Sequence, residues 1–510
     1  MLDFGNGVSV GWRRFSLGLR RVNAGWCALG RWPSERAASR FIAGLIVVWS
    51  IYCSMILIPT GHFTYDQAYF YEESVRVADS LRWPAYGPFV SGIQPSPLTP
   101  GGMMYVVLSV PFLVFRDPRI GVAWIHVLVA LGAWLFERAL RKLEVAAPIR
   151  VATLSLYVLS IAHARAEETF WNGDLFLFIT PMLLYLATTL ITRPNWLWAY
   201  VAFGATAALS TQTHLSGGMG IMMCLAIVLL LRPRALHVKG LAAIALAFAA
   251  CYAPYFAHEA ANGFPNARLL RTAVPSGSHL SRDALVRCLV SPIMYVSHTE
   301  YPGQLLQFWS RDWVIWAAII SGWAAAAMSV LGLVVRNPMK LWGCLVVLAL
   351  PMYFRLTGRE YYDHYVATVI PFVCLIPGGG MGWLLSRARR FRMPALGYLA
   401  VYAVTGFAIL QAELKRPVLH PVMPWNGMNV GLQLERTQAD LDHGKPVRSR
   451  PGDDDALIRS ILARRVLGKE LSFKVNKRYC KAEIYLSGFA APPPDHATVP
   501  LGNNSVFVCD

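Results

Sequence analysis

The sequence predicts an all-α polytopic membrane protein that ends in a small polar domain. The chain has 510 residues, of which 55% are hydrophobic and 15% are charged, whereas soluble domains carry about 25% charged residues. Apolar runs recur from about residue 41 to about residue 412, and most are about as long as a helix needs to cross a bilayer. Composition and run length together exclude an ordinary soluble protein.

The chain contains about twelve apolar segments, and we expect eleven of them to be transmembrane helices. Their approximate bounds are 41–59, 101–115, 120–137, 151–163, 174–192, 196–212, 214–231, 239–257, 313–335, 341–356, 365–385 and 395–412.

The segment 101–115 decides the topology. If it crossed the bilayer, three clusters of basic residues would lie on the opposite side from the basic N-terminus, against the positive-inside rule. The segment is also short and follows Pro95, Pro97 and Pro100. We therefore expect an interfacial or re-entrant helix in the first outer loop, a cytoplasmic N-terminus and an outer C-terminus. The three clusters are Arg138, Arg141, Lys142 and Arg150; Arg232, Arg234 and Lys239; and Arg387, Arg389, Arg390 and Arg392.

These expectations divide the chain into three parts. Residues 1–40 form a basic cytoplasmic tail, residues 41–412 a transmembrane domain, and residues 413–510 a small α/β or irregular soluble domain on the outer face. The net charge of +18 is explained by arginines in short loops between spans. We therefore expect no nucleic-acid partner, and membrane lipids instead.

An aspartate follows the first apolar segment closely. Asp66 is flanked by three tyrosines, of which Tyr65 is a candidate substrate-binding residue. Apolar residues then repeat at helical spacing (Ala68, Tyr71, Val75 and Ala78), and Glu72, Glu73, Arg76 and Asp79 are expected on the opposite, polar face of that helix. The alternative reading is that Asp66 only caps a surface helix.

This arrangement of loop and spans resembles the first outer loop of GT-C glycosyltransferases, which use polyprenyl-phosphate sugars. The superfamily includes protein O-mannosyltransferases, lipid A aminoarabinose transferases and RgtA-type lipopolysaccharide transferases. The resemblance covers roughly residues 41–385. It implies a GT-C-like fold in which Asp66 is the general base that deprotonates an acceptor hydroxyl.

The second outer turn carries three further acids, Glu167, Glu168 and Asp174. One reading is a solvated turn in which Arg165 neutralises a glutamate. The resemblance implies instead that one of the acids supports Asp66, with Glu168 and Asp174 as leading candidates for a catalytic role and Glu167 as a substrate-binding residue.

A departing lipid phosphate needs cations or strong hydrogen-bond donors near its oxygens. Similar turns in the aminoarabinose and mannosyl transferases hold the lipid phosphate, which favours the crowded turn 355–365 over the long loop 258–312. For the arginines of the long loop, exposure to solvent or lipid headgroups is the simpler reading, and for His214 it is an interfacial hydrogen bond. The candidate substrate-binding residues are His214, Arg268, Arg271, Arg359, Tyr362 and His364.

The resemblance implies an inverting glycosyltransferase in the inner membrane of the cell. Its donor is a polyprenyl-phosphate sugar, and its acceptor is a glycan, lipid A or a protein at the periplasmic face. Asp66 is followed by Gln67 and Ala68, so the D-x-D pair of metal-using members is missing and no metal or other cofactor is expected. The alternatives are a flippase or transporter for lipid-linked sugars, and a structural or sensor protein.

Two cysteines differ from the other seven. Cys480 and Cys509 lie in the polar C-terminal region, where an oxidising compartment would allow a disulfide. Two unrelated thiols remain the alternative.

Overall fold

A computed structural model describes most of the chain. It covers residues 34–60, 63, 65–89, 97–160, 170, 172–272, 312–335, 343, 345, 348–353, 367–387, 389–419, 430–443, 447–448, 454–469, 473–475, 478–484, 497–502 and 505–509.

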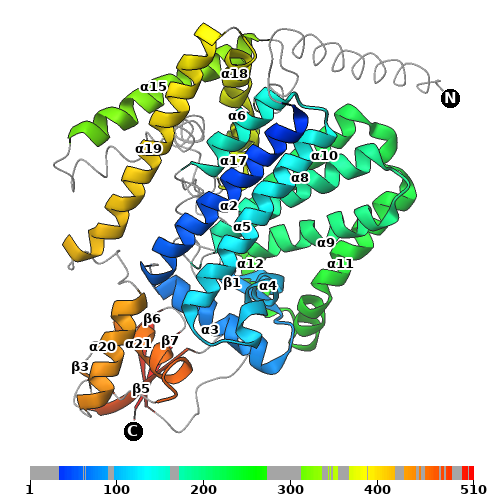
Figure 1. The fold of residues 1–510 in the computed structure, drawn as a ribbon. Coiled ribbons are helices and arrows are strands. Elements are labelled where there is room, and N and C mark those ends of the chain that lie inside the picture. Colours follow the sequence, from blue (N-terminus) through cyan, green and yellow to red (C-terminus); the bar gives the residue numbers. More distant parts are fainter. Residues whose placement is uncertain are drawn as a thin grey trace.

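The predicted apolar segments other than 341–356, much of which lies outside the described residues, form helices, which run alongside one another in Figure 1. Helix α5 packs between α2 and α8, α9 packs against α11, and α18 packs against α6 and α15. The bounds of these helices are α2 Glu35–Thr60, α5 Pro118–Lys142, α6 Ala147–Val158, α8 Phe176–Thr192, α9 Leu197–Thr213, α10 Gly218–Leu231, α11 Val238–Ala261, α15 Asp312–Val334, α17 Ile370–Val373, α18 Leu375–Leu385 and α19 Arg389–Leu419.

Within the described ranges, five helices are long and apolar enough to cross a bilayer, namely those in 35–55, 118–142, 172–192, 238–261 and 315–334. Four shorter apolar helices lie at Met103–Leu113, Ala147–Val158, Leu215–Leu231 and Ile370–Leu385. Membrane-spanning character is therefore a property of this chain, and the number of eleven spans stays a prediction.

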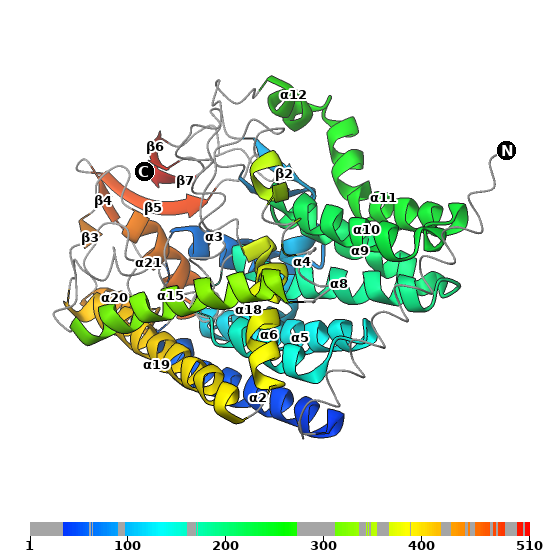
Figure 2. The ribbon, with the colours of Figure 1, turned by 90° about the horizontal axis from the view of Figure 1, so that it is seen from above.

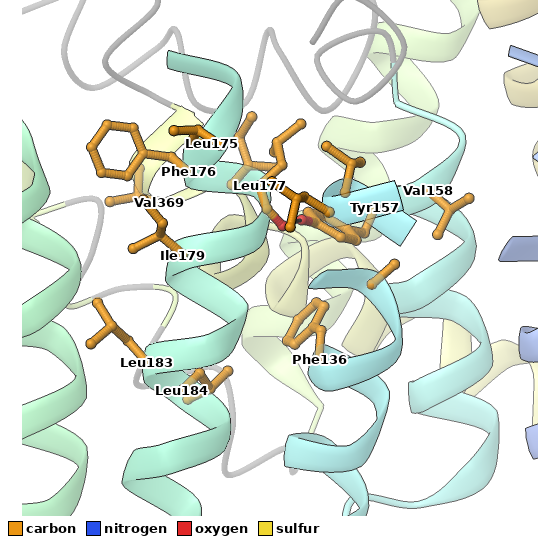
Figure 3. Close-up of a cluster of buried hydrophobic side chains, with 14 of the residues drawn as sticks. Phe136, Tyr157, Val158, Leu175, Phe176, Leu177, Ile179, Leu183, Leu184 and Val369 are labelled. Atoms are coloured by element: carbon orange, nitrogen blue, oxygen red, sulfur yellow. Dashed lines mark hydrogen bonds between the residues drawn. The ribbon is translucent and has the colours of Figure 1, made fainter. Parts of the chain in front are cut away.

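The core of the bundle depends on close backbone contact between α5 and α8. A Cβ atom at Gly132 would lie 2.2 Å from the carbonyl oxygen of Leu177, so only glycine fits there. The hydroxyl of Tyr157 donates to the same carbonyl at 2.8 Å. Figure 3 shows Phe136 beside Tyr157, and the centroids of the two rings are 5.3 Å apart.

The basic clusters gather at one end of the bundle. The Arg150 side chain is 2% exposed and forms ion pairs with Glu137, at 3.7 Å, and with Glu35 at the start of α2. After α10, Arg232 donates to the carbonyl of Ile191 at 2.6 Å. The starts of α2 and α6 therefore share this end with the ends of α8 and α10. The cytoplasmic location of this end stays a prediction.

The opposite end carries the first loop. It contains α3 Tyr65–Ser80, β1 Tyr86–Phe89, β2 Leu98–Pro100, α4 Met103–Ser109 and the 3-10 helix η1 Val110–Leu113, and β1 pairs with β2 in antiparallel fashion. At 1.5 Å per residue, α4 and η1 together are only about half as long as the bilayer core is thick. The helix expected at 101–115 is therefore too short to span a membrane unaided.

The C-terminal region forms a five-stranded sheet with two helices, beside α3 in both Figure 1 and Figure 2. The elements are α20 Val430–His443, β3 Val447–Arg448, α21 Asp454–Arg465, β4 Phe473–Val475, β5 Arg478–Ile484, β6 Ala497–Gly502 and β7 Ser505–Cys509, with the strand order β3-β4-β5-β7-β6. Helix α19 continues past residue 412 to Leu419, and the three domain boundaries stay predictions.

The register of β5 and β7 places Cys480 directly opposite Cys509. Residues opposite each other in an antiparallel pair have Cα atoms about 4.5–5.5 Å apart, within the range that a disulfide bridges. The disulfide itself stays a prediction. Thiol counting on the unreduced, denatured protein checks it: the bonded protein exposes two fewer thiols than the reduced one.

Candidate active site

Helix α3 carries Asp66 in its first turn. Apolar spacing predicts this helix correctly, because Ala68, Tyr71 and Val75 are each 0% exposed while Ala78 is 8% exposed. Asp66 is the second residue of the helix and its side chain is exposed. A carboxylate in a first turn is stabilised by the positive end of the helix dipole. The site thus has an acidic group that solvent and a substrate can reach, with Tyr65 beside it as the first residue of α3.

Glu73 lies on the same stripe of α3 as Asp66, because residues seven apart share a helix face. This stripe is directed toward Tyr105 of α4, which is 1% exposed and whose ring lies 6.5 Å from that of Tyr69. Burial raises the pKa of Tyr105 well above its usual value, and Tyr69, Glu73 and Asp66 add to the rise. Burial likewise raises the pKa of Glu73 to about 7, against the opposing charge of Arg76.

Glu72 and Asp79 share a second stripe of α3, which is directed toward α21. Glu72 is 0% exposed, and two arginines of α21 hold its carboxylate: Arg464 at 3.1 Å and Arg465 at 2.8 Å. Burial acts to raise the pKa of Glu72, but the hydrogen bond from Arg465 and the charges of Arg464, Arg465 and Arg76 outweigh it and leave the pKa below its usual value. The two acids of this polar face are buried, Glu72 at 0% and Glu73 at 3% exposure, because helices α4 and α21 cover them.

A row of aromatic rings joins the first loop to the second outer turn. Tyr71 lies 5.9 Å from Phe63 and 5.1 Å from Phe112, and Phe112 lies 5.7 Å from Phe170, measured between ring centroids. Edge-to-face contacts of this kind stabilise the packing beyond the buried area alone. The first loop and the turn before α8 are therefore at the same end of the bundle, as the sequence predicts.

The second turn continues in the 3-10 helix η2, Asn172–Leu175. The side-chain amide of Asn172 donates to the backbone carbonyl of Thr213 at 3.1 Å, and this hydrogen bond holds the turn against the end of α9. Asp174 is 5% exposed, so it is part of the packed interior of this end. Glu167 and Glu168 lie outside the described residues.

His214 links α9 to the 3-10 helix η3, Leu215–Gly217. Its Nδ1 atom lies 3.1 Å from the backbone nitrogen of Ser216, from which it accepts, and 2.8 Å from the Ser216 hydroxyl. The carbonyl of Leu215 accepts from the hydroxyl of Tyr353 at 2.6 Å. His214 is therefore hydrogen-bonded within its own turn, and its places at the membrane interface and in a donor pocket stay predictions.

The C-terminal end of α11 holds the β1–β2 hairpin in place. Glu259 is 0% exposed and accepts from the Tyr86 hydroxyl at 2.5 Å and from the backbone nitrogen of Ala267 at 2.9 Å. Asn266, at the start of α12, accepts from the backbone nitrogen of Leu98 at 2.8 Å and donates to its carbonyl at 2.9 Å. The long loop therefore begins at the same end as Asp66.

Helix α12, Pro265–Thr272, carries two of the predicted phosphate ligands. Arg268 and Arg271 are both exposed. The other predicted ligands, Arg359, Tyr362 and His364, lie outside the described residues.

Sequence reasoning missed Gln212 and Glu259. The Gln212 side chain accepts from the backbone nitrogen of Met103 at 2.9 Å and donates to the carbonyl of Cys251 at 3.0 Å, so it joins α4, α9 and α11. Polar residues in the last turns of apolar helices are the signal for both, because a buried polar group needs a partner.

In the part of the chain that the structure describes, no group of three or more histidine, cysteine, aspartate or glutamate residues is arranged to hold an ion. Hard divalent cations take several oxygen ligands, and Asp66, the candidate base, supplies a single carboxylate.

Several solved structures resemble the chain, among them the following three. ArnT from Cupriavidus metallidurans bound to undecaprenyl phosphate matches with a TM-score of 0.52 and 13% identity, over 94% of this chain and 98% of that one. ArnT in the apo state matches with a TM-score of 0.52 and 13% identity, over 93% and 98%. The Archaeoglobus fulgidus oligosaccharyltransferase AglB, in complex with an inhibitory peptide and a dolichol-phosphate, matches with a TM-score of 0.48 and 10% identity, over 84% and 64%.

Sequence comparison adds nothing further, since no family model and no curated protein matches the chain. The likeness to ArnT extends over nearly the full length of both chains. The chain therefore has the GT-C fold of membrane glycosyltransferases.

Proposed function

We propose that the protein transfers a sugar from a polyprenyl-phosphate donor to an acceptor hydroxyl at the membrane surface. The observation that carries the proposal is Asp66: an exposed carboxylate in the first turn of α3, at the loop-bearing end of a GT-C fold. The ArnT structure of the same fold holds undecaprenyl phosphate, which supports a lipid phosphate of this kind as the donor's carrier.

The reaction follows from the chemistry of these groups. The acceptor hydroxyl gives its proton to the Asp66 carboxylate while its oxygen forms a bond to the anomeric carbon. The bond between that carbon and the phosphate oxygen breaks, and the electron pair leaves with the lipid phosphate. A single in-line displacement inverts the anomeric configuration.

Cations stabilise the charge that develops on the departing phosphate. We assign this role to Arg359 and His364, with Tyr362, Arg268 and Arg271 as further donors. Glu168 or Asp174 supports Asp66 from the second turn, Glu167 binds substrate, and His214 and Tyr65 line the donor side. No metal ion takes part in the proposed step.

The experiment for this proposal uses the purified full-length protein in lipid nanodiscs. A panel of undecaprenyl-phosphate sugars is supplied with candidate acceptors, and mass spectrometry follows free undecaprenyl phosphate and the glycosylated product. Envelope glycans, lipid A and surface proteins from a deletion strain identify the acceptor. Transport of the intact donor across vesicles, without cleavage, would instead identify a flippase.

We further propose that the protein lies in the inner membrane with its loop-bearing end in the periplasm. Single cysteines at the exposed positions Glu144 and Arg234 should then resist an impermeant thiol reagent in intact cells. Cysteines at the exposed positions Asn262 and Lys469 should react. The opposite pattern would place Asp66 in the cytoplasm and overturn the orientation.

A further inference from the structure

Helix α21 of the C-terminal region holds the helix that carries Asp66. Arg465 donates to both carboxylate oxygens of Glu72, at 2.8 and 3.0 Å, and to Asp79 at 2.9 Å. Arg464 donates to Glu72 at 3.1 Å. The partners in these contacts are far apart in sequence: Glu72 and Arg465 are 393 positions apart.

The contact has the geometry of a rigid attachment. Paired hydrogen bonds from one guanidinium to one carboxylate fix orientation as well as distance. Because Arg465 reaches two residues that are seven positions apart, it spans two turns of α3 on a single face. Arg116, which follows η1, binds Asp79 from the other side at 2.6 Å.

Helix α21 is itself anchored, so it can serve as a support. Ile461 and Leu462 are 1% and 0% exposed and belong to the same hydrophobic core cluster as the transmembrane helices. Arg459 forms an ion pair with Asp440, which joins α21 to α20. A displacement of this region would therefore carry α3 with it.

Asp66 lies six residues before Glu72 in the same helix, which is about 9 Å at 1.5 Å per residue. A helix this short moves as a rigid unit, so a rotation or translation of α3 at Glu72 also displaces Asp66. Misplacing a catalytic group by about 1 Å can cost roughly 100-fold in rate. The attachment is thus close enough to set the geometry of the base.

We propose that Arg464 and Arg465 are positioning residues for Asp66, so that the C-terminal domain forms part of the transferase site. This inference rests on the proposed function. It assigns the domain a defined role: through Glu72 and Asp79 it holds α3 in the orientation in which the Asp66 carboxylate meets the acceptor hydroxyl.

The test compares kinetics of the full-length protein and its variants in nanodiscs. The double variant Arg464→Gln/Arg465→Gln should lower kcat by about 10-fold or more, because the base is misaligned. The KM for the donor should stay within about twofold, because the variant removes no donor contact. Lysine at both positions keeps the charge and should recover part of the kcat.

Two controls separate positioning from general damage. Arg436, exposed on α20 of the same region, loses the same charge in Arg436→Gln and should keep a normal kcat. Thermal unfolding is followed through the buried thiols of Cys53, Cys224 and Cys374, which react with a fluorogenic maleimide only when the bundle opens. The Gln variants should still unfold in one cooperative transition, at a lower temperature because they break the ion pairs with Glu72.

A double-mutant cycle gives the decisive readout. In an Asp66→Asn background, the two Gln substitutions should lower the residual rate no further, because they act through Asp66. If the two Gln substitutions lowered the rate by the same factor with and without Asp66→Asn, the arginines would act independently of Asp66 and the inference would be overturned. An unchanged kcat of the Arg464→Gln/Arg465→Gln variant that retains Asp66 would also overturn it. If the double variant does not fold, Arg465→Lys alone decides: a kcat equal to that of the unmodified protein rejects positioning. Full activity of Asp66→Asn by itself would instead refute the proposed function.

Discussion

The two halves of α3 differ in how far their acidic side chains are exposed. In residues 65–71, Asp66 is exposed at the positive end of the helix. In residues 72–80, Glu72 and Glu73 are 0% and 3% exposed, and Glu72 is bound by arginines of α21. The first half leaves a carboxylate accessible to a substrate, and the second half uses carboxylates to hold the helix in place.

The difference shows that burial and partners decide what an acid does. Glu72 and Glu73 are adjacent in sequence, yet the pKa of Glu72 is lowered because arginines outweigh its burial, while burial raises the pKa of Glu73 to about 7. Arg76 contacts both, at 3.4 and 3.3 Å, so it does not distinguish them. The contacts of Glu72 with the arginines of α21 account for the difference between the two pKa values.

Replacement of Glu72 should have the largest effect on stability. Glu72→Gln leaves Arg464 and Arg465 near a buried neutral group, and breaking a buried ion pair costs 3–5 kcal/mol. We expect about 3 kcal/mol, since the arginine side chains are 36% and 22% exposed. Thermal unfolding in detergent at pH 7 measures it, and a loss below about 1 kcal/mol would show that the ion pairs do not fix α3.

The same residue gives a pH dependence with a definite sign. Because the folded pKa of Glu72 is lowered from 4.5, its stabilising contribution is present above pH 4.5 and is lost as the pH falls through the folded value. The Gln variant should therefore approach the unmodified protein in stability only in acid.

Replacement of Glu73 should act in the opposite direction and by no more than that of Glu72. Its folded pKa is raised from 4.5 to about 7, so the folded protein holds its proton more tightly and becomes less stable as the pH rises between these values. Glu73→Gln removes this penalty. At pH 8 it should stabilise the protein by up to about 3 kcal/mol, given 1.36 kcal/mol per pKa unit and a folded pKa that already includes the charge of Arg76. A stability difference that does not change between pH 5 and pH 8 would contradict the assignment.

Asp79 should show the smallest effect. Its side chain is 41% exposed, and it pairs with Arg116, itself 38% exposed, and with Arg465. Ion pairs at such exposure contribute roughly 0.2–1 kcal/mol and are screened by salt. Asp79→Asn should therefore lower stability by less than about 1 kcal/mol, and the difference should shrink in 0.5 M NaCl, where the Debye length is only a few Å. A salt-independent loss would argue for a buried role.

Local patterns predicted the parts of the fold that depend on local physics. Apolar spacing located α3, and hydrophobic run length located the helices from α2 to α19, because both reflect which surfaces leave water. Spacing also predicted the buried face of α3 through Ala68, Tyr71 and Val75. The GT-C resemblance added the expected fold, which the likeness to ArnT supports.

Contacts between distant parts of the chain were not predictable in this way. The sequence of α3 indicates a polar face but not what covers it. The arginines nearly 400 residues later explain why Glu72 is buried. The burial of Asp174 depends similarly on α9, because Asn172 bonds to Thr213. A side chain's partner on another element leaves no periodic signal in either segment.

The most direct test of the central claim measures transfer and stability on one variant, Asp66→Asn. The amide keeps the shape of the side chain and removes its basicity. Transfer from an undecaprenyl-phosphate sugar should fall by roughly 10²–10⁴-fold, the usual contribution of a positioned general base. The unfolding temperature should stay within about a degree of that of the unmodified protein, because Asp66 is exposed. Near-normal transfer by the folded variant would contradict the account.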